Sequence, residues 1–305
     1  SSAYRSLQHS LKSGLRKALN IQEKNEIILA PSGTDVSLMF AGLCQSVYSY
    51  RINHILVASD ESGSGVGMAL HGYHFANTTA FNIPSEKDTP IEGFKEAGVD
   101  KISLRDNSGF LKETESLENE IYALISASIA NGEQAVLHVM DQSKLGYASP
   151  RFEFVQKLME EFGNKLLVMV DNSQLRMGNE RLDTYLNQGC LVTLTGSKFF
   201  TGPPFCGALI LSSEFSKKLK KGKELPVGLK DYFPKNEFLN FQTVTTTLES
   251  RFNFGSYLRW TAAVTEMERY YQIPISLREL STELFCEYVS KIIENSEFLE
   301  SLESR

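Results

Sequence analysis

Short apolar runs alternate with amphipathic segments along most of the chain. Runs of five or six mainly apolar residues have the length and flanking turns of buried strands, and they occur at residues 25–30, 54–59, 135–140, 166–170, 191–195 and 207–211. Apolar positions three or four apart indicate helices at residues 4–19, 113–130 and 152–162, and from residue 36 onward. Strands and helices that alternate at this spacing are typical of an α/β fold, with a mostly parallel sheet sandwiched by helices.

The first helix is predicted to bury one stripe of leucines that recur every four residues, Leu7, Leu11, Leu15 and Leu19. Two other stretches carry weaker patterns. Residues 80–109 alternate short strands with turns, and residues 213–240 are charged and irregular.

The C-terminal part of the chain predicts two long helices. The first covers residues 257–271, and Pro274 separates it from a second that runs to about Glu294. We interpret residues 1–272 as one large domain. Residues 273–305 are interpreted as a connector helix and the start of a small C-terminal domain that is largely absent or truncated.

Two opposite charges follow neighbouring apolar runs. Asp171 ends the run at 166–170, and Lys198 follows the run at 191–195. Open α/β sheets bind ligands at the carboxyl ends of their strands, and a buried ion pair alone contributes little net stability. A ligand that needs both groups is therefore a better explanation than a structural ion pair.

A third candidate site lies at the turn Pro31-Ser32-Gly33-Thr34-Asp35. A strand that leads through a glycine turn into a helix directs free N–H groups and the positive end of the helix dipole toward an anion such as phosphate. The alternative is an ordinary helix cap, in which Ser32, Thr34 or Asp35 satisfies its own helix.

A further motif, a glycine-rich turn, is weaker. Gly63, Gly65 and Gly67 follow a strand as in dinucleotide-binding turns, but the spacing differs and the preceding Asp60 and Glu61 would repel a pyrophosphate. A nucleotide-binding protein therefore ranks last among the functions considered.

Histidines provide no clear metal or catalytic motif. His71 and His74 lie three apart on an expected helix without a third ligand nearby, which favours ordinary polar packing over a metal site. His138, inside a buried strand, is interpreted as a core histidine with a satisfied hydrogen bond. We expect no bound metal.

Composition narrows the possible partners. The 305 residues are 42% hydrophobic and 22% charged, with a net charge of -6, so we expect neither nucleic acid nor a membrane as partner. The basic run Lys217–Lys223 is interpreted as a solvated surface. Four widely spaced cysteines and the lack of a secretory leader or membrane-spanning run indicate a reducing, cytoplasmic compartment.

Pyridoxal phosphate is a cofactor that needs all three candidate groups. Its aldehyde forms a Schiff base with a lysine, its ring nitrogen pairs with a carboxylate, and its phosphate occupies an anion site. The sequence resembles the fold-type-I pyridoxal-phosphate enzymes, in the class V aminotransferase and cysteine-desulfurase-like branch. The resemblance rests on PSGTDV at 31–36, D-x-x-Q at 171–174, T-x-S-K at 195–198 and the 27 residues from Asp171 to Lys198. It spans roughly residues 26 to 270.

This resemblance implies a role for each matching residue. Lys198 would carry the Schiff base and later move the α-proton of the substrate, and Asp171 would pair with the pyridine nitrogen. Gln174 and Ser143 would contact the phenolic oxygen of the cofactor. The implied phosphate ligands are Gly33, Thr34, Thr195 and Ser197.

The resemblance also implies an assembly. Residues 245–247, all threonine, resemble a segment that in this family reaches the phosphate of the neighbouring subunit, so we expect a homodimer. One position departs from the family, which usually places an aromatic residue or histidine over the cofactor ring after the strand at 54–59. Here Glu61, Ser62 and Gly63 follow that strand, so either a small residue covers the ring or His71 or His74 reaches it.

The function expected from these residues is a pyridoxal-phosphate-dependent transferase, an aminotransferase that acts on an amino-acid-like substrate. The alternatives are a lyase of the desulfurase or Cβ-lyase type, or a non-catalytic relative that retains the scaffold. Desulfuration needs a mobile cysteine nucleophile, and neither Cys206, beside the lysine loop, nor Cys286, in a predicted helix, fits that role well.

Overall fold

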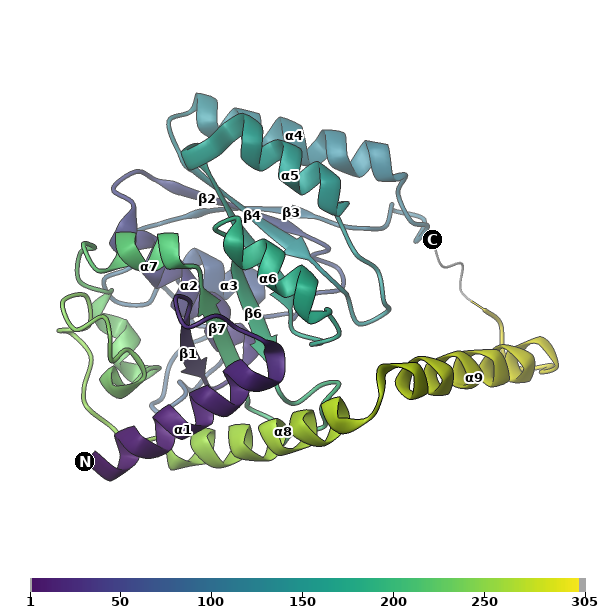
Figure 1. The fold of residues 1–305 in the computed structure, drawn as a ribbon. Coiled ribbons are helices and arrows are strands. Elements are labelled where there is room, and N and C mark those ends of the chain that lie inside the picture. The colour runs from purple at the N-terminus through teal and green to yellow at the C-terminus, as the bar shows by residue number, and fades with distance from the viewer. Residues whose placement is uncertain (1, 302–305) are drawn as a thin grey trace.

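A seven-stranded sheet forms the centre of the molecule in the computed structural model, which describes residues 2–301 (Figure 1). Its strands are β1 (Glu26–Ala30), β2 (Ile52–Val57), β3 (Gly98–Ile102), β4 (Gln134–Met140), β5 (Leu166–Asn172), β6 (Leu191–Thr195) and β7 (Gly207–Leu211). Their spatial order is β1-β7-β6-β5-β4-β2-β3. β7 pairs antiparallel with β1 and β6, and the other four pairs are parallel. The predicted mostly parallel α/β sheet is confirmed.

Helices cover both faces of this sheet (Figure 1). They are α1 (Ser2–Leu19), α2 (Gly33–Val47), α3 (Val66–His71), α4 (Thr114–Ala130), α5 (Phe152–Phe162), α6 (Asn179–Asn187), α7 (Ser213–Leu219), α8 (Phe254–Gln272) and α9 (Ile275–Glu294). Short 3₁₀ turns lie at η1 (Gly163–Lys165), η2 (Val227–Asp231) and η3 (Lys235–Glu237).

Alternate residues of each central strand contribute to two different hydrophobic cores. Val168 and Val170 of β5 pack into the core under α1, α4, α5, α6 and α8. Leu167 and Met169 pack into the core under α2, α3 and α7. Because each side chain of this size contributes about 1.5–3 kcal/mol when it is fully buried, both faces of the strand hold it in register.

The first helix follows the expected stripe only in part. Leu11, Leu15 and Leu19 are buried, but Leu7 is 37% exposed, so its predicted burial is wrong. In its place, Tyr4 and Gln8 take the buried positions of the first turns. Gln8 donates a 2.8 Å hydrogen bond to the buried carboxylate of Glu237, and this contact replaces apolar packing at this end of α1.

Three segments differ in secondary structure from the sequence-based expectation. Residues 213–240 contain α7, which begins where Ser212 Oγ accepts the N–H of Phe215, and the lysines of its last turn lie within the basic run. Residues 80–109 contain one strand, β3, and otherwise form turns. The helix expected to hold both His71 and His74 ends at His71, because Gly72 adopts φ of +79°.

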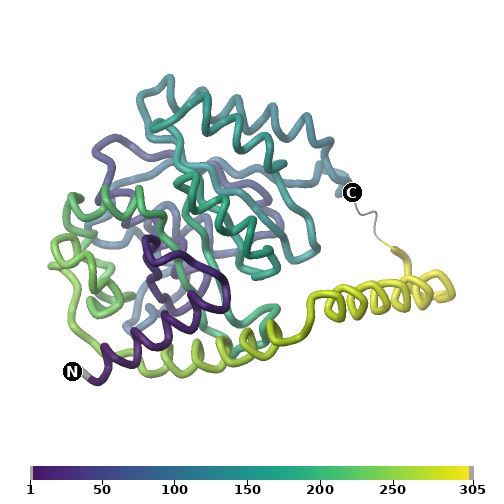
Figure 2. Tube along the Cα trace, in the orientation of Figure 1, coloured from purple at the N-terminus to yellow at the C-terminus, as the bar shows by residue number. Residues whose placement is uncertain are grey.

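The last helix leaves the α/β body. α9 buries none of its residues, and Figures 1 and 2 show it running away from the sheet at the end of α8. The boundary between the two helices lies at Ile273 and Pro274, as the proline predicted.

Candidate active site

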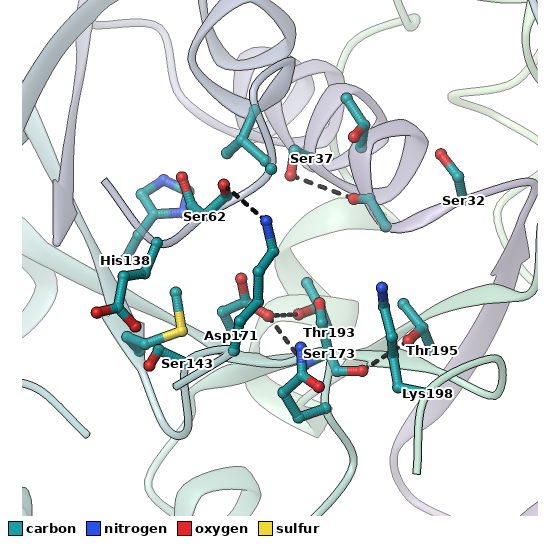
Figure 3. A pocket seen from close by; sticks show the side chains of 18 of the residues that line it. Ser32, Ser37, Ser62, His138, Ser143, Asp171, Ser173, Thr193, Thr195 and Lys198 are labelled. Atoms are coloured by element: carbon teal, nitrogen blue, oxygen red, sulfur yellow. Dashed lines mark hydrogen bonds between the residues drawn. The ribbon is translucent and has the colours of Figure 1, made fainter. Parts of the chain in front are cut away.

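The carboxyl ends of β4, β5 and β6 and the start of α2 surround a cavity of about 320 Å³ (Figure 3). Its lining contains all the site residues suggested by the sequence, Gly33, Thr34, Ser143, Asp171, Gln174, Thr195, Ser197 and Lys198. These residues come from four separate segments of the chain. The fold therefore brings together groups that the sequence could only suggest one by one.

Asp171 is held by two hydrogen bonds at one oxygen. Its Oδ1 accepts the backbone N–H of Ser173 at 2.9 Å and the hydroxyl of Thr193 at 3.2 Å. Thr193 reaches it because the two residues are partners in the parallel β5–β6 register. Its Oδ2 receives no hydrogen bond from residues 2–301, so one carboxylate oxygen is available to a ligand.

Lys198 lies on the loop that joins β6 to β7. The loop is closed at its base by the hydrogen bond from Gly196 N–H to Cys206 O at 2.9 Å. Thr201 and Phe205 adopt φ of +53° and +66°, a strained conformation for residues with side chains. Lys198 is exposed and extends beside Thr195 (Figure 3), and its amine has no ion-pair or hydrogen-bond partner within the described residues. Lys198 and Asp171 therefore form no structural ion pair.

The turn before α2 acts as a helix cap and also leaves N–H groups free. Ser32 caps the helix, since its Oγ accepts the N–H of Asp35 at 3.1 Å and its carbonyl accepts that of Val36 at 2.9 Å. The N–H groups of Gly33 and Thr34 have no partner in residues 2–301 and remain available to an anion. The structure therefore confirms the helix cap, and the anion site at this turn stays a prediction.

Gly33 fits closely against the floor of the cavity. A Cβ at this position would lie 3.3 Å from Thr195 Cγ2 and 3.7 Å from Ser173 Oγ. The missing side chain thus leaves room at the start of α2 for a ligand atom to approach the backbone.

The hydroxyl groups around the cavity differ in what they can still donate. Ser143 Oγ accepts the N–H of Tyr147 at 3.0 Å, which leaves its own proton for a ligand. Thr195 Oγ1 already donates to Ser173 O at 2.6 Å, so it must rotate before it can donate to a phosphate. Gln174 lines the cavity next to Leu175, whose φ is +54°.

Two residues of the site, Lys144 and Thr193, were not predicted from the sequence. Lys144 Nζ donates a 3.5 Å hydrogen bond to Ser62 O across the cavity. Its position directly after Ser143 was the sequence feature that could have indicated it. Thr193 could not be found from the sequence, because its contact with Asp171 depends on the strand register.

The position expected to cover a cofactor ring holds Glu61, Ser62 and Gly63, which all line the cavity. Neither His71 nor His74 lines it. His71 Nδ1 contacts Ala97 O at 2.9 Å, and His74 Nδ1 contacts the Tyr232 hydroxyl at 2.6 Å. The two histidines are therefore ordinary packing residues.

His138 lies at the back of the cavity in β4. It shares a 3.0 Å hydrogen bond with His54 of β2, and both rings pack edge-on against Phe40. Burial lowers the pKa of His138 to about 3, so the ring is neutral. These contacts agree with a satisfied core histidine.

Thr245, Thr246 and Thr247 lie outside the lining of the cavity. Their hydroxyl groups donate within the same chain, to Phe241 O at 3.0 Å, to the Glu224 carboxylate and to Leu225 O at 3.2 Å. The homodimer that this segment suggested stays a prediction.

Two other expectations concern what the chain binds. Within residues 2–301, histidine, cysteine, aspartate and glutamate side chains nowhere gather in a group of three or more that could hold a metal ion. None of the helices in this range is both long and apolar enough to span a bilayer.

Solved structures identify the fold. An alanine–glyoxylate aminotransferase from Nostoc sp. matches with a TM-score of 0.62 at 17% identity, over 98% of this chain and 69% of that one. A phosphoserine aminotransferase from Cytophaga hutchinsonii matches with a TM-score of 0.55 at 13% identity, over 97% of this chain and 69% of that one. A cysteine desulfurase from Escherichia coli matches with a TM-score of 0.51 at 14% identity, over 90% of this chain and 59% of that one.

These similar structures are fold-type-I pyridoxal-phosphate enzymes of class V, and this chain has the fold of their large domain. The shared fold agrees with the resemblance of the sequence, which implies pyridoxal 5'-phosphate as the cofactor. By sequence alone, neither a family model nor a curated protein matches the chain.

The residues of the cavity fit this cofactor. An amine without a partner, a carboxylate with one unbonded oxygen, and a glycine turn with two unbonded N–H groups surround the same space. These are the three groups that the aldehyde, the ring nitrogen and the phosphate require.

Proposed function

We propose that this protein is a pyridoxal-phosphate-dependent enzyme that acts on an amino-acid-like substrate through Lys198, and that its reaction is aminotransfer. The observation that carries the proposal is the convergence of Lys198, Asp171 and the start of α2 on one cavity. The fold supports the general class of enzyme, and the choice of aminotransfer rests on the cysteine residues discussed below.

Asp171 is arranged to hold a cation at its free oxygen. The hydrogen bonds from Ser173 N–H and Thr193 Oγ1 to Oδ1 fix the orientation of the carboxylate. Oδ2 would then keep the pyridine nitrogen protonated. When bound, the cofactor supplies an electron sink for the bond that breaks at the Cα of the substrate.

Lys198 is suited to move a proton. Its amine is exposed and free of partners among residues 2–301, so no ion pair has to break before it acts. Lys198 Nζ would hold the cofactor covalently in the resting enzyme. Once the amine of the substrate takes its place there, the released lysine amine would take the α-proton of the substrate and return it. The strained backbone at Thr201 and Phe205 fixes the path of its loop.

The phosphate would lie at the start of α2. The N–H groups of Gly33 and Thr34, with the hydroxyl groups of Thr34 and Ser197, would donate to it, and the helix dipole adds to the attraction. Ser143 and Gln174 would bind the phenolic oxygen, since the Ser143 proton is free to donate.

Cysteine chemistry argues against desulfuration. Cys206 lines the cavity but is 1% exposed, and burial raises the pKa of its thiol to about 12, so it remains protonated at neutral pH. Cys286 is exposed on α9 and does not line the cavity. Neither thiol supplies a mobile thiolate, and aminotransfer is therefore preferred over a desulfurase-type lyase reaction.

A spectrum tests the proposal directly. Wild-type protein mixed with pyridoxal phosphate should develop an absorption band at roughly 410–430 nm, and Lys198→Ala should lack this band while its circular dichroism is unchanged. Lys144→Ala is the matched control, because Lys144 is the other lysine of the lining and should leave the band in place. A colourless wild-type protein would refute the proposal.

The substrate reaction needs a second measurement. Addition of an amino acid should shift the band, and a ketoacid product would identify aminotransfer, whereas sulfide would identify a lyase. A bound cofactor whose spectrum no amino acid changes would instead favour a non-catalytic relative. The residues Glu61, Ser62 and Gly63 at the ring-covering position motivate that second candidate.

A further inference from the structure

A separate cavity of about 300 Å³ lies between α1, the edge strand β1 and residues 237–241. We call this space the α1 cavity. Within the described chain, its lining shares no residue with the lining of the cofactor cavity. The two spaces are connected through β1, because Glu26, Ile27 and Ile28 line the α1 cavity and the same strand leads to the turn at Gly33.

Glu237 brings a buried carboxylate to the α1 cavity, and one of its oxygens is unused. Glu237 is 3% exposed and lines the cavity. Its Oε1 accepts the amide of Gln8 at 2.8 Å and the hydroxyl of Tyr4 at 3.4 Å. Its Oε2 has no hydrogen-bond partner among residues 2–301. A buried acceptor without a partner is costly, and a ligand that donates to it would remove that cost.

Gln8 adds a second unused acceptor. It is buried and also lines the α1 cavity. Because its amide nitrogen must face the carboxylate of Glu237, the orientation of the amide group is fixed and its oxygen points elsewhere. That oxygen, Oε1, has no hydrogen-bond partner within residues 2–301. Both unused acceptors require a donor, which a ligand in the cavity could supply.

Lys12 lines the α1 cavity as a half-buried cation without an adjacent counter-charge. Its Nζ donates to Glu237 O at 3.4 Å and forms no ion pair with any residue of 2–301. Burial lowers the pKa of Lys12, although the charges of Glu237 and Glu26 oppose this effect. Burial likewise raises the pKa of Glu237, and the charge of Lys12 opposes it only in part. The two charged groups are therefore incompletely compensated by each other.

The arginine and the other carboxylates of the lining already have partners. Arg16 donates to Gln22 O at 2.9 Å, and Glu23 lies 3.6 Å from Arg16 Nε. Glu26 accepts a hydrogen bond from Asn240 Nδ2 at 2.8 Å. Within the described lining, the groups left for a ligand are therefore one ammonium group, one carboxylate oxygen and one amide oxygen.

We propose that the α1 cavity binds a small zwitterion, a free amino acid, whose ammonium group donates to Glu237 and Gln8 and whose carboxylate accepts from Lys12. A zwitterion carries both charges that the lining leaves incompletely compensated, whereas a simple anion or cation would supply only one of them. An apolar side chain suits the rest of the lining, which includes Ile27, Ile28, Leu239 and Phe241. The site does not rest on the proposed function, because none of the residues proposed to hold the cofactor lines it.

Calorimetry with leucine tests the site in the full chain without added cofactor. Leucine should bind, whereas 4-methylpentanoate, which lacks the ammonium group, and leucinamide, which lacks the carboxylate, should bind at least about tenfold more weakly. Glu237→Gln removes the charge that holds the ammonium group, and Lys12→Met removes the charge that holds the carboxylate. Each substitution should weaken leucine binding by roughly ten- to a hundredfold.

Lys17→Met is the matched control, because Lys17 lies on the same helix as Lys12, is exposed and does not line the α1 cavity. It should bind leucine as wild type does, and urea unfolding curves check that each variant is folded. Equal leucine affinity in wild type, Glu237→Gln and Lys12→Met would overturn the proposal. A wild-type protein that binds no leucine, or that binds 4-methylpentanoate and leucinamide as tightly as leucine, would overturn it too.

A further variant distinguishes the α1 cavity from the cofactor cavity. Lys198→Ala changes the cofactor cavity alone, so it should bind leucine as wild type does. Loss of leucine binding in Lys198→Ala would place the ligand in the cofactor cavity and overturn the proposal.

Discussion

Replacement of Asp35 by asparagine should change the pH dependence of stability. Asp35 is 5% exposed in the first turn of α2, and burial raises the pKa of its carboxyl from 3.8 to about 6. Its side chain accepts a hydrogen bond from Ser32 Oγ, which only partly opposes this effect. The folded protein therefore binds a proton at Asp35 more tightly than the unfolded chain does.

The size and sign of the effect follow from linkage between proton binding and folding. A pKa that rises from 3.8 to about 6 on folding corresponds to about 3 kcal/mol. The protonated carboxyl favours the folded state below pH 3.8, and this contribution is lost as the pH rises through about 6. Above that pH, folding carries the full cost of a buried charge.

Urea unfolding of cofactor-free protein between pH 4 and pH 8 measures this cost. Relative to wild type, Asp35→Asn should gain about 1–3 kcal/mol in free energy of unfolding between these two values, with the change centred between pH 4 and pH 6. Any constant effect of the amide cancels in that comparison. Asp88→Asn is the matched control, because Asp88 is exposed and its φ of +65° suits asparagine. A difference between Asp35→Asn and wild type that does not vary with pH would refute the reasoning.

Three further substitutions test the site and its support. Thr193→Val removes one of the two hydrogen bonds to Asp171 Oδ1. The affinity for pyridoxal phosphate, measured by absorbance titration, should therefore fall about tenfold. Unchanged affinity would contradict the role of Thr193. Gly207→Ala would place a Cβ 2.5 Å from Ser32 O. In urea unfolding, this clash should lower the free energy of unfolding by about 1–3 kcal/mol. Gly178→Ala, where a Cβ would meet open space, is the control and should leave the free energy of unfolding unchanged. Trp260→Phe removes the buried 3.0 Å hydrogen bond to Gly207 O, and a loss of about 1–3 kcal/mol is expected in thermal unfolding followed by circular dichroism.

The strands of the sheet were predictable because each is a buried run. β6 and β7 agree with their apolar segments residue for residue, since strands buried on both faces need apolar side chains throughout. The directions of these strands were not predictable, because a buried strand has the same apolar pattern whether it pairs parallel or antiparallel with its neighbour. α7 was missed because it has only seven residues and lies in a charged stretch, where its main signal is the cap at Ser212.

The candidate site was predictable where one residue type is chemically required. Asp171 lies near the end of β5, Lys198 lies in the loop after β6, and Gly33 begins α2, so their positions follow from the local sequence pattern. The support for Asp171 was not predictable, since Thr193 depends on register.

The reversed direction of β7 has a consequence for engineering. Because β7 runs against β6, the loop with Lys198 leaves and re-enters the sheet at the same edge, and the hydrogen bond from Gly196 to Cys206 ties its two ends together. Lengthening or shortening the loop would change where the amine reaches without shifting either strand. If Lys198 has the role proposed above, libraries of varied loop length could change the reaction while the sheet stays unaltered.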